Sequence, residues 1–544
     1  MKTFIKKQFP ISRNFKFRGC IGRSFLASVT SALLLCAAAA QANTITVTSA
    51  SDSGAGSLRQ AILDASPGDT INFAAGITTI NLTSGELLID KNLTINGPGA
   101  NLLTVQRSSM MPFRIFDIAS TGITVTIAGL TIANGTAEIG AGVYCAGGTV
   151  TNCAITNNQA VGDAPKGGGV YCNGGTVSRC VISGNSVTST NSYLYGAFAE
   201  GGGIYAVSES QIDHSTVTNN TLTGYYANGA GINANNGSVQ NCTVSGNTAY
   251  GHWYADGGGV YMTANTGGFV RNCLITGNNA HTDPGGANWA VGGGVYFNSG
   301  GILESSTVSG NILYGNFSNG GGLAYGSQIR NTIIYGNTAA ADPNYYLNQY
   351  GAATFDHCDS TPLPPGTGNI ASDPGFVSGY HLATGSPCID TGINQAWMTT
   401  ATDLDGNRRI WNGTVDMGAF EFGSMPSPAF FNGETALGGG FYYLQFANGT
   451  PFGYYSYLSD QNFIYHIDLG FEYLFDANDA NHGIYFYDFA SSSFFYTSPT
   501  LFPDLYDFSL NAWLYYLPDV NNPGRYTHNP RWFFNFATGQ WITL

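Results

Sequence analysis

Positive charge is scarce in this sequence. Seven of the 19 Lys and Arg residues lie within the first 24 positions, which leaves 12 to balance the 33 Asp and Glu of the remaining chain, a net charge of −21. So acidic a chain argues against nucleic acid as a partner, and against acidic polysaccharides as easy ones. The plainer alternative is that the acidic surface keeps the protein in solution.

Long hydrophobic runs are also missing. The one apolar run, residues 25–40, is shorter than the ~18–20 residues that a membrane-spanning helix needs. It follows the basic segment and precedes Ala40-Gln41-Ala42, a small-x-small cleavage pattern. We therefore predict a secretory signal peptide over residues 1–42, and a secreted or cell-surface protein with no transmembrane helix after cleavage.

What the sequence has in abundance is a repeat of ~28 residues. Each copy opens with a glycine cluster, continues through a short β-rich stretch and usually ends on asparagine. The clusters begin at Gly140, Gly167, Gly201, Gly229, Gly257, Gly292 and Gly320. Such a period is typical of a solenoid, so we expect a rod of stacked coils rather than a globule around one pocket.

Asparagine and cysteine recur at fixed places in the copies. The asparagines are Asn158, Asn185, Asn219, Asn247, Asn278, Asn311 and Asn337. We predict that they take left-handed turn conformations and hydrogen-bond to one another as a structural ladder. Cys145 and Cys172 share one repeat position; Cys153, Cys180, Cys242 and Cys273 share another.

The cysteine spacings do not resemble a zinc site. Coils stacked ~4.8 Å apart allow disulfides between Cys145 and Cys172 and between Cys153 and Cys180. Cys358 and Cys388 form a separate candidate pair. The alternative is a ladder of small buried thiols that fills a narrow core.

Two segments resemble known families. Residues 46–73 resemble the start of secreted bacterial β-helix proteins that carry a CSLREAI motif; here the motif reads GSLRQAI, with Gly56 in place of the cysteine. Within residues 369–422, the phrases DPGFV, YHLATGSPCIDTG, TDLDGNRRI and VDMGAFEF are similar to the choice-of-anchor Q family. The resemblance implies a right-handed parallel β-helix on a secreted protein with a varied C-terminal anchor, and it transfers no catalytic residues.

We therefore predict an all-β fold: a right-handed parallel β-helix with a short N-terminal capping helix, followed by a small aromatic-rich antiparallel β module. A Ser57-to-Gln60 capping box opens the helix, which should end near Ala65. The last segment is more than about a quarter Phe, Tyr and Trp, arranged as successive hairpins. The predicted segments are 1–42 (signal peptide), 43–139 (cap and first coils), 140–358 (β-helix repeats), 359–428 (closing segment and linker) and 429–544 (aromatic tail).

Cleavage of sugar chains needs a cluster of catalytic groups, and none stands out in the sequence. Between residues 140 and 350 the only Lys and Arg are Lys166, Arg179, Arg271 and Arg330. The acids are single and scattered, at Asp163, Glu200, Glu209, Asp213, Asp256, Asp283, Glu304 and Asp342. Asp213-His214 is the most suggestive pair, but we place His214 at the repeat position of Cys153 and Cys180 and predict a core role for it. Acids from different copies can still meet in space.

Calcium is a candidate ligand of the closing segment. Asp403, Asp405 and Asn407 alternate as oxygen ligands around Gly406, as in calcium loops, and Asp416 or Glu421 could add to them. The rest of an EF-hand loop is missing. The alternative is a polar turn between strands.

Aromatic side chains occupy the same place in five successive copies, between the asparagine and the next glycine cluster. They are Tyr193, Tyr195, Phe198, Tyr225, Tyr226, Tyr250, Trp253, Tyr254, Trp289, Tyr314 and Phe317. A solenoid stacks them along one edge, where rings can pack on sugar C–H faces or on protein partners. The alternative is that these loops fold onto each other and cover the rod.

We predict a non-enzymatic secreted or surface protein with an adhesin-like or envelope display role, which binds glycans or cell-envelope components through the stacked aromatic loops. The alternative function is an extracellular polysaccharide lyase or glycoside hydrolase. A third interpretation makes the tail a carbohydrate-binding module. A cluster of at least two carboxylates on one face of the rod would favour the enzyme.

Overall fold

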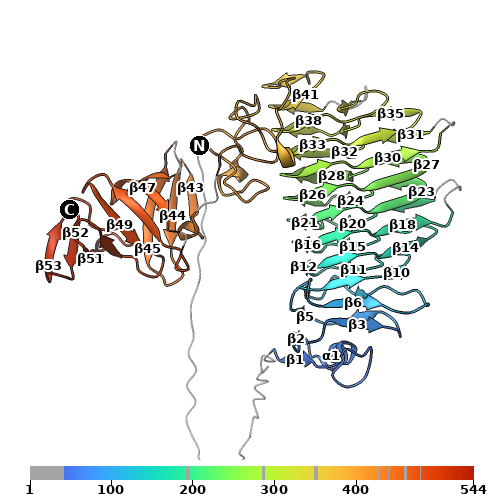
Figure 1. Ribbon diagram of the computed structural model, residues 1–544, viewed down its shortest axis with the longest axis horizontal. Helices are drawn as coiled ribbons and strands as arrows, with labels where there is room; N and C mark the ends of the chain where they lie inside the picture. The colour runs from blue at the N-terminus through green and yellow to red at the C-terminus, as the bar shows by residue number, and fades with distance from the viewer. Residues whose placement is uncertain are drawn as a thin grey trace, which may run out of the picture. The chain divides into compact units, whose positions relative to one another are not determined.

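The computed structural model describes residues 42–191, 197–284, 288–347, 353–424, 428–438, 440–458, 462–477 and 479–544. The predicted signal peptide lies outside these residues except for Ala42. The described part of the chain is all-β apart from a few short helices: stacked parallel coils come first and an antiparallel sheet follows (Figure 1). None of its helices is long and apolar enough to cross a membrane.

The coils form three parallel sheets, here named A, B and C. A typical coil gives two strands to sheet A and one each to sheets B and C. Sheet A contains β1 (Thr44–Val47), β2 (Asp69–Phe73), β4 (Leu87–Ile89), β5 (Leu93–Asn96), β7 (Phe116–Ile118), β8 (Val125–Ala128), β11 (Val143–Ala146), β12 (Thr149–Thr151), β15 (Val170–Asn173), β16 (Thr176–Ser178), β20 (Ile204–Val207), β21 (Gln211–Asp213), β24 (Ile232–Asn235), β25 (Ser238–Gln240), β28 (Val260–Arg271), β32 (Val295–Glu304), β36 (Leu323–Ala324), β37 (Gln328–Arg330), β39 (Tyr345–Tyr346), β40 (Thr354–Asp356) and β42 (Gly366–Thr367).

Sheets B and C complete each turn of the coil. Sheet B contains β3 (Thr79–Leu82), β6 (Thr104–Arg107), β9 (Thr131–Ala133), β13 (Ala154–Thr156), β17 (Val181–Ser183), β22 (Thr216–Thr218), β26 (Thr243–Ser245), β29 (Leu274–Thr276), β33 (Thr307–Ser309), β38 (Ile333–Tyr335) and β41 (Asp359–Ser360). Sheet C contains β10 (Thr136–Ala137), β14 (Gln159–Gly162), β18 (Ser186–Ser189), β23 (Thr221–Asn228), β27 (Thr248–Asp256), β30 (Asn279–Thr282) and β34 (Ile312–Tyr314), and is widened by β19 (Phe198–Glu200), β31 (Trp289–Val291) and β35 (Phe317–Asn319).

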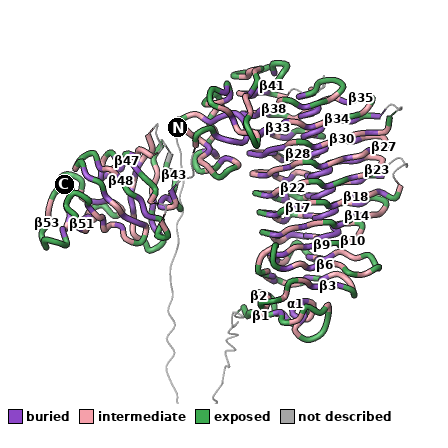
Figure 2. The backbone as a smooth tube through the Cα atoms, viewed as in Figure 1, coloured by how far each residue is buried: buried purple, intermediate pink, exposed green. Residues whose placement is uncertain are grey.

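The core is a narrow tube filled by aligned aliphatic side chains. Ile155 pairs in register with Ile182, and Ile182 pairs with Val217. All three are fully buried, and the same alternation of inward and outward residues recurs along the coils (Figure 2). Because most of these strands are only three or four residues long, one or two inward side chains per strand carry the packing, so the hydrophobic pattern is short but repeated.

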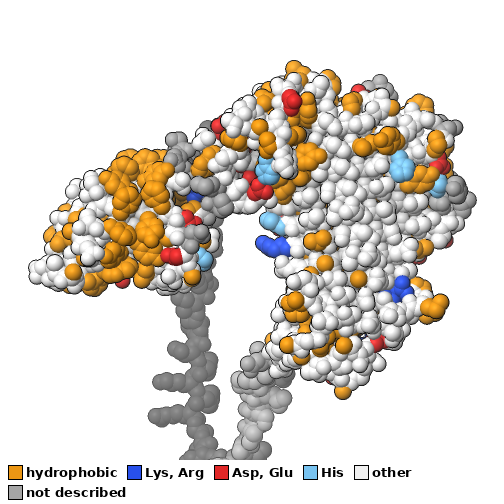
Figure 3. Space-filling view, viewed as in Figure 1, with side chains coloured by type: hydrophobic (Ala, Val, Ile, Leu, Met, Phe, Trp, Pro, Cys, Tyr) orange, Lys and Arg blue, Asp and Glu red, His pale blue; other side chains and the backbone are white. Residues whose placement is uncertain are grey.

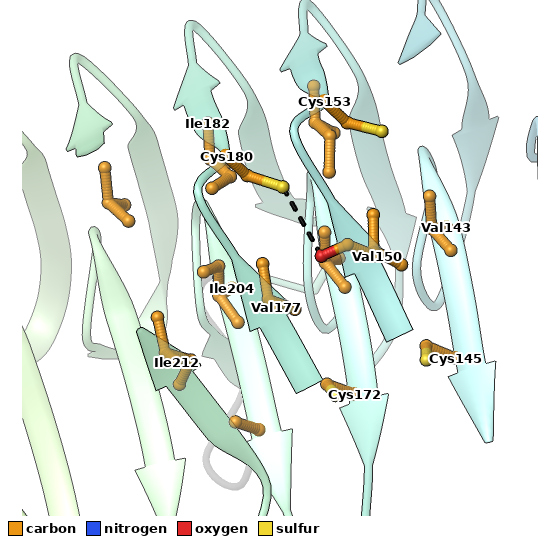
Figure 4. Packing of buried hydrophobic residues seen from close by; sticks show 14 of the residues in the cluster. Val143, Cys145, Val150, Cys153, Cys172, Val177, Cys180, Ile182, Ile204 and Ile212 are labelled. Carbon is orange, nitrogen blue, oxygen red and sulfur yellow. Dashed lines mark hydrogen bonds between the residues drawn. The ribbon is translucent and has the colours of Figure 1, made fainter. Parts of the chain in front are cut away.

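Cysteine fills part of this tube. The eight cysteines of the described chain are all buried and free. Cys145 and Cys172 are register partners, and Cys180 Sγ donates to the carbonyl oxygen of Val150 at 3.5 Å (Figure 4). Cys358 lies in the main core and Cys388 in a separate cluster beside Ile333. This arrangement fits the ladder of thiols, and disulfide pairing stays a prediction.

The asparagine ladder exists, but one member was predicted wrongly. The buried ladder runs through Asn158, Asn185, Asn220, Asn247, Asn278, Asn311 and Asn337, and ends on Asn344. In each step the side-chain amide donates to the next asparagine oxygen at 2.9–3.2 Å. Asn219 precedes the ladder position and has φ 54°, where the neighbouring coils place Gly184 and Gly246. The left-handed turn and the ladder thus belong to adjacent residues, and the Asn219-Asn220 pair concealed the offset.

The glycine clusters form a corner between sheets C and A. The first glycine of each cluster has φ between 60° and 74°. At Gly229 an added Cβ atom would lie 2.3 Å from the carbonyl oxygen of Ile232. Only glycine allows the chain to turn this closely against its own backbone.

Helix α1 (Leu58–Asp64) covers the open end of the first coil, as predicted. The Ser57 side chain accepts from the Gln60 backbone N–H at 3.2 Å, and Leu58, Ala61 and Ile62 are buried. The Gln60 side chain bonds to Asp64 instead of completing the capping box.

The closing segment lies along sheet B and contains the short 3-10 helices η1 (Ser378–Tyr380) and η2 (Ala396–Thr399). Asn272 donates to the carbonyl of Thr402 at 3.0 Å, and the Ala419 N–H donates to Thr307 Oγ1 at 3.0 Å. Arg409 and Glu421, from two of the quoted phrases, form a fully buried ion pair of 3.3 Å. These two sequence segments are therefore joined by a buried ion pair inside the closing segment.

The tail begins with 3-10 helix η3 (Ala429–Phe431) and is one antiparallel sheet whose strands pair in sequence order. The strands are β43 (Thr435–Gly438), β44 (Phe441–Gln445), β45 (Pro451–Tyr457), β46 (Phe463–His466), β47 (Gly470–Asp476), β48 (Ile484–Asp488), β49 (Ser493–Thr497), β50 (Asp504–Asp507), β51 (Ala512–Tyr516), β52 (Trp532–Asn535) and β53 (Gln540–Thr543). The predicted module of antiparallel hairpins is confirmed.

Candidate functional site

The aromatic segments of the rod lie in register between neighbouring coils. They are strands, and their hydrogen bonds widen sheet C. One register column, here named the rod column, contains Phe198, Tyr226, Tyr254, Trp289 and Phe317. Tyr225 and Trp253 stack in a second, shorter column. Tyr193 and Tyr195 lie outside the described residues.

Ring geometry limits what the rod column can bind. Phe198 and Tyr226 stack with ring centroids 4.6 Å apart and planes 18° apart, and Trp289 stacks on Phe317 at 5.1 Å and 24°. In such a stack each ring covers the face of its neighbour, and mainly the ring edges are exposed to solvent. Phe317 is 47 % exposed, so the column remains an accessible apolar strip, but it offers few free faces to a sugar.

Tyr250 and Tyr314 belong to a third column with a polar character. Tyr250 pairs in register with His281, and His281 pairs with Tyr314. Asp283 accepts from the Tyr250 hydroxyl and contacts His252 Nδ1 at 2.9 Å. Burial raises the pKa of Asp283, but these hydrogen bonds outweigh it and leave the pKa below its usual value. The aromatic residues of the rod are therefore divided among three separate columns.

The tail carries a larger aromatic surface that the sequence did not assign to one face. Successive register pairs place aromatic residues opposite each other on the same side of the sheet, such as Tyr465 with Phe471 and Phe475 with Tyr485. We name this side the tail face; its most exposed members are Phe441, Tyr465, Phe471, Phe475, Tyr485, Phe489, Phe494, Phe508, Trp532, Phe536 and Trp541, each 37–55 % exposed. Hydrophobic side chains crowd the visible surface of the tail (Figure 3). The available signal was the alternation of aromatic residues along each strand.

Rings on the tail face are tilted against each other. The planes of Tyr465 and Phe471 are 56° apart, those of Phe475 and Phe494 are 46° apart, and those of Phe534 and Trp541 are 65° apart. Tilted neighbours leave ring faces accessible, in contrast to the rod column. The opposite side of the sheet is a closed core that includes Phe486 and Phe495.

The tail face is also poor in positive charge. The tail has two basic residues, Arg525 and Arg531. Arg525 pairs with Asp468 at 2.6 Å, and Arg531, 5 % exposed, pairs with Asp488 at 2.8 Å. Both cations are therefore neutralised by acids of the same module.

Acids from different coils share one register position at the corner between sheets C and A. Lys166, Glu200, Asn228 and Asp256 occupy one register position in four successive coils, here named the corner row. Glu200 and Asp256 are two strand spacings apart, or ~9.6 Å between Cα atoms. Lys166 Nζ lies 2.5 Å from Glu200 Oε2. Asp256 Oδ1 is buried without a hydrogen-bond partner, and burial raises the pKa of Asp256 to about 8.

The core role predicted for His214 is wrong. Ser215, 2 % exposed, takes the place of the cysteine in this coil and accepts from the Cys180 backbone N–H. His214 lies one residue earlier at φ 46°, with its side chain 44 % exposed and Nδ1 2.8 Å from Asp213. The exchange of Cys for Ser in this copy shifted the alignment by one position.

The candidate calcium loop is a tight polar turn. The Asp403 carboxylate accepts backbone N–H groups from Asp405, Asn407 and Glu421 at 2.7–3.0 Å. Asp405 points away and contacts His381 Nε2 at 2.7 Å. No group of three or more His, Cys, Asp or Glu side chains in the described residues is placed to hold a metal ion. This geometry fits the polar turn, whose donors already use the Asp403 oxygens.

One comparison with known proteins agrees with the fold. A family model described as a right handed beta helix region matches residues 75–266. Among solved structures, the crystal structure of pectate lyase Pel9A is similar at 14 % sequence identity over 70 % of this chain and 96 % of that one, with a TM-score of 0.39. No curated protein matches the sequence. The chain therefore contains a right-handed parallel β-helix of the kind that this family model describes.

Proposed function

We propose that this is a secreted or cell-surface, non-enzymatic β-helix protein of adhesin-like role, which binds neutral glycans on its tail face. The observation that carries the proposal is the set of eleven exposed aromatic side chains on one side of the tail sheet. Contiguous apolar surface of this kind marks an interaction site on a soluble protein.

A neutral polysaccharide suits this surface better than a charged one. Ring faces pack against the C–H faces of sugars, and tyrosine hydroxyls supply hydrogen bonds. Carboxylated glycans need exposed cations, but both basic residues of the tail are paired with acids. The strong net negative charge of the chain adds long-range repulsion of acidic polymers.

The rod has a supporting part in this proposal. Its stacked columns are long and regular, which suits a spacer that holds a binding module at a distance. The exposed edges of Trp289, Tyr314 and Phe317 add weaker contacts for a glycan chain or an envelope component. We also propose that the protein is secreted and held at the cell surface.

Binding of the full chain to insoluble neutral polysaccharides tests the proposal, with an insoluble uronate polymer as the charged comparison. The double variant Phe471→Ser, Trp541→Ser removes two rings from the tail face, each worth roughly 0.5–1.5 kcal/mol in a ring contact. We expect binding to fall by about tenfold or more. The matched control, Phe198→Ser with Phe317→Ser, removes two rings of similar exposure from the rod column and should change binding much less. Undiminished binding by a folded tail variant refutes the tail as the site.

The corner row supports a second candidate function, hydrolysis of a glycan. Glu200 and Asp256 are two carboxyl groups of this row, and burial raises the pKa of Asp256 to about 8, which suits a group that protonates a glycosidic oxygen while a second carboxyl activates water. Release of reducing ends from neutral glycans by the wild type, and its loss in Glu200→Gln, would favour this function over display.

A further inference from the structure

Three side chains from three successive coils converge on the corner row. Lys166 precedes one glycine corner, Glu200 precedes the next, and Asn233 lies on β24 in the coil after that. The carboxylate of Glu200 contacts both of the others, each through a different oxygen. Oε2 is 2.5 Å from Lys166 Nζ, and Oε1 accepts from the Asn233 side-chain nitrogen at 3.4 Å. One carboxylate therefore joins an amine and a primary amide.

The surroundings of this triad are aromatic and mostly closed. Lys166 Nζ lies 4.7 Å from the centre of the Tyr205 ring and 3.4 Å from its hydroxyl. Asn233 is 2 % exposed, and the Glu200 side chain is 16 % exposed. Hydrogen bonds and charge–charge attractions are stronger in such a site than in water, because the local dielectric constant is lower.

Asn233 also breaks a pattern. Its register position holds tyrosine in the two preceding coils and in the following one, at Tyr171, Tyr205 and Tyr261. The only break in this run is an asparagine, and it lies where its amide reaches Glu200. A residue that served only packing would continue the stack of rings.

We propose that Lys166 and Asn233 form an intramolecular isopeptide bond, with Glu200 as the proton carrier. This inference does not depend on the proposed glycan binding. Both reacting groups contact the same carboxylate, and this positioning supplies the effective concentration that an amine needs to attack an amide.

The atoms balance without any added reagent. Lys166 Nζ passes a proton to Glu200 along the 2.5 Å contact, and the neutral amine attacks Cγ of Asn233. The new Nζ–Cγ bond forms as the Cγ–Nδ2 bond breaks. Glu200 gives its proton to the leaving NH2 group, which departs as ammonia, and the second amine proton passes to Glu200. The product is one secondary amide and one ammonia.

The protonation state of Lys166 sets the rate at which the isopeptide bond forms. Burial lowers the pKa of Lys166, but the Glu200 carboxylate and Tyr205 outweigh it, and the pKa ends above its usual value. The amine is therefore protonated at neutral pH, and the bond should form slowly after folding and faster as the pH is raised toward 10.

Intact-mass measurement of the full chain tests the proposal. Wild type aged at pH 9 should be lighter than its sequence by one ammonia, and its digest should contain one branched peptide that joins the segments around Lys166 and Asn233. Lys166→Arg keeps the charge and the ring contact but lacks the amine nucleophile, so it should keep its full mass. Lys91→Arg, a matched lysine change outside the corner row, should lose ammonia like the wild type.

Two further outcomes decide the roles. Glu200→Gln should form the bond at least tenfold more slowly, because it lacks the proton carrier. Ammonia loss that persists in Lys166→Arg would mean a succinimide elsewhere, and would overturn the bond. A wild-type mass that stays complete after prolonged incubation at pH 9 also overturns it, whatever the variants do.

Discussion

Replacement of Asp256 by asparagine should stabilise the protein, and increasingly so as the pH rises. Asp256 Oδ1 is buried without a partner, and burial raises the pKa of the carboxyl to about 8 from an ordinary 3.8. At pH 7 the carboxyl is ionised in the unfolded chain but mostly protonated in the folded one, and this difference in pKa costs the folded state up to roughly 4 kcal/mol. The side chain keeps a partly exposed edge, so we expect about 2–4 kcal/mol.

The sign follows from the direction of the pKa change. A group whose pKa is raised on folding stabilises the fold while it is protonated, below pH ~4, and loses that contribution as the pH rises toward 8. The neutral amide of Asp256→Asn has no such dependence. Urea denaturation of both proteins between pH 4.5 and 9 should give the smallest difference in midpoint at the acidic end and a growing advantage of Asp256→Asn above it. Glu209→Gln, at an exposed acid, should follow the wild type. Parallel midpoints of wild type and Asp256→Asn across this range would refute the reasoning.

Two further changes probe the rod. Asn247→Ala removes a side chain that accepts from Asn220 at 3.0 Å and donates to Asn278 at 2.9 Å; it leaves several buried groups unpaired and should cost about 3–5 kcal/mol of unfolding free energy by urea titration. Asn219→Gly, one residue before the neighbouring ladder position, should cost under about 1 kcal/mol because glycine already takes that conformation in adjacent coils, and an equal loss in both variants would contradict the ladder. For the cysteines, maleimide labelling without a reductant should modify none of the eight in the folded protein and all eight after unfolding. Fewer than eight in unfolded protein would establish disulfides.

The repeat was sufficient to predict the rod, because a corner that only glycine can make and an interior that only small apolar side chains can fill must recur in every coil. The helix cap at Ser57 could also be predicted, because the Ser57 hydroxyl accepts from the backbone N–H three residues later, at Gln60. Single-residue assignments failed where one copy departs from the others. Ser215 replaces cysteine and Asn219 replaces glycine, and both substitutions shift the apparent alignment while they preserve the backbone.

Polar contacts between residues far apart in the sequence could not be predicted from the sequence. Glu200 looked isolated because its partners, Lys166 and Asn233, lie 34 and 33 residues away, and only the coil length brings them together. The same holds for Arg409 and Glu421, whose phrases suggest surface motifs or metal ligands but form a buried pair. A spacing near the length of one coil, which varies between copies, is the signal that identifies contacts such as those of Glu200.

Strand geometry explains why the two aromatic surfaces differ. In the rod, parallel strands stack identical positions ~4.8 Å apart without a change of side-chain direction, so equivalent rings superimpose and cover each other's faces. In the tail, antiparallel neighbours alternate between close and wide pairs in a twisted sheet, so opposed rings meet at an angle. Phe198 on Tyr226 at 18° and Tyr465 against Phe471 at 56° are the two outcomes. The richer supply of ring faces therefore lies in the less regular part of the chain, which is why a search for ligands should begin with the tail.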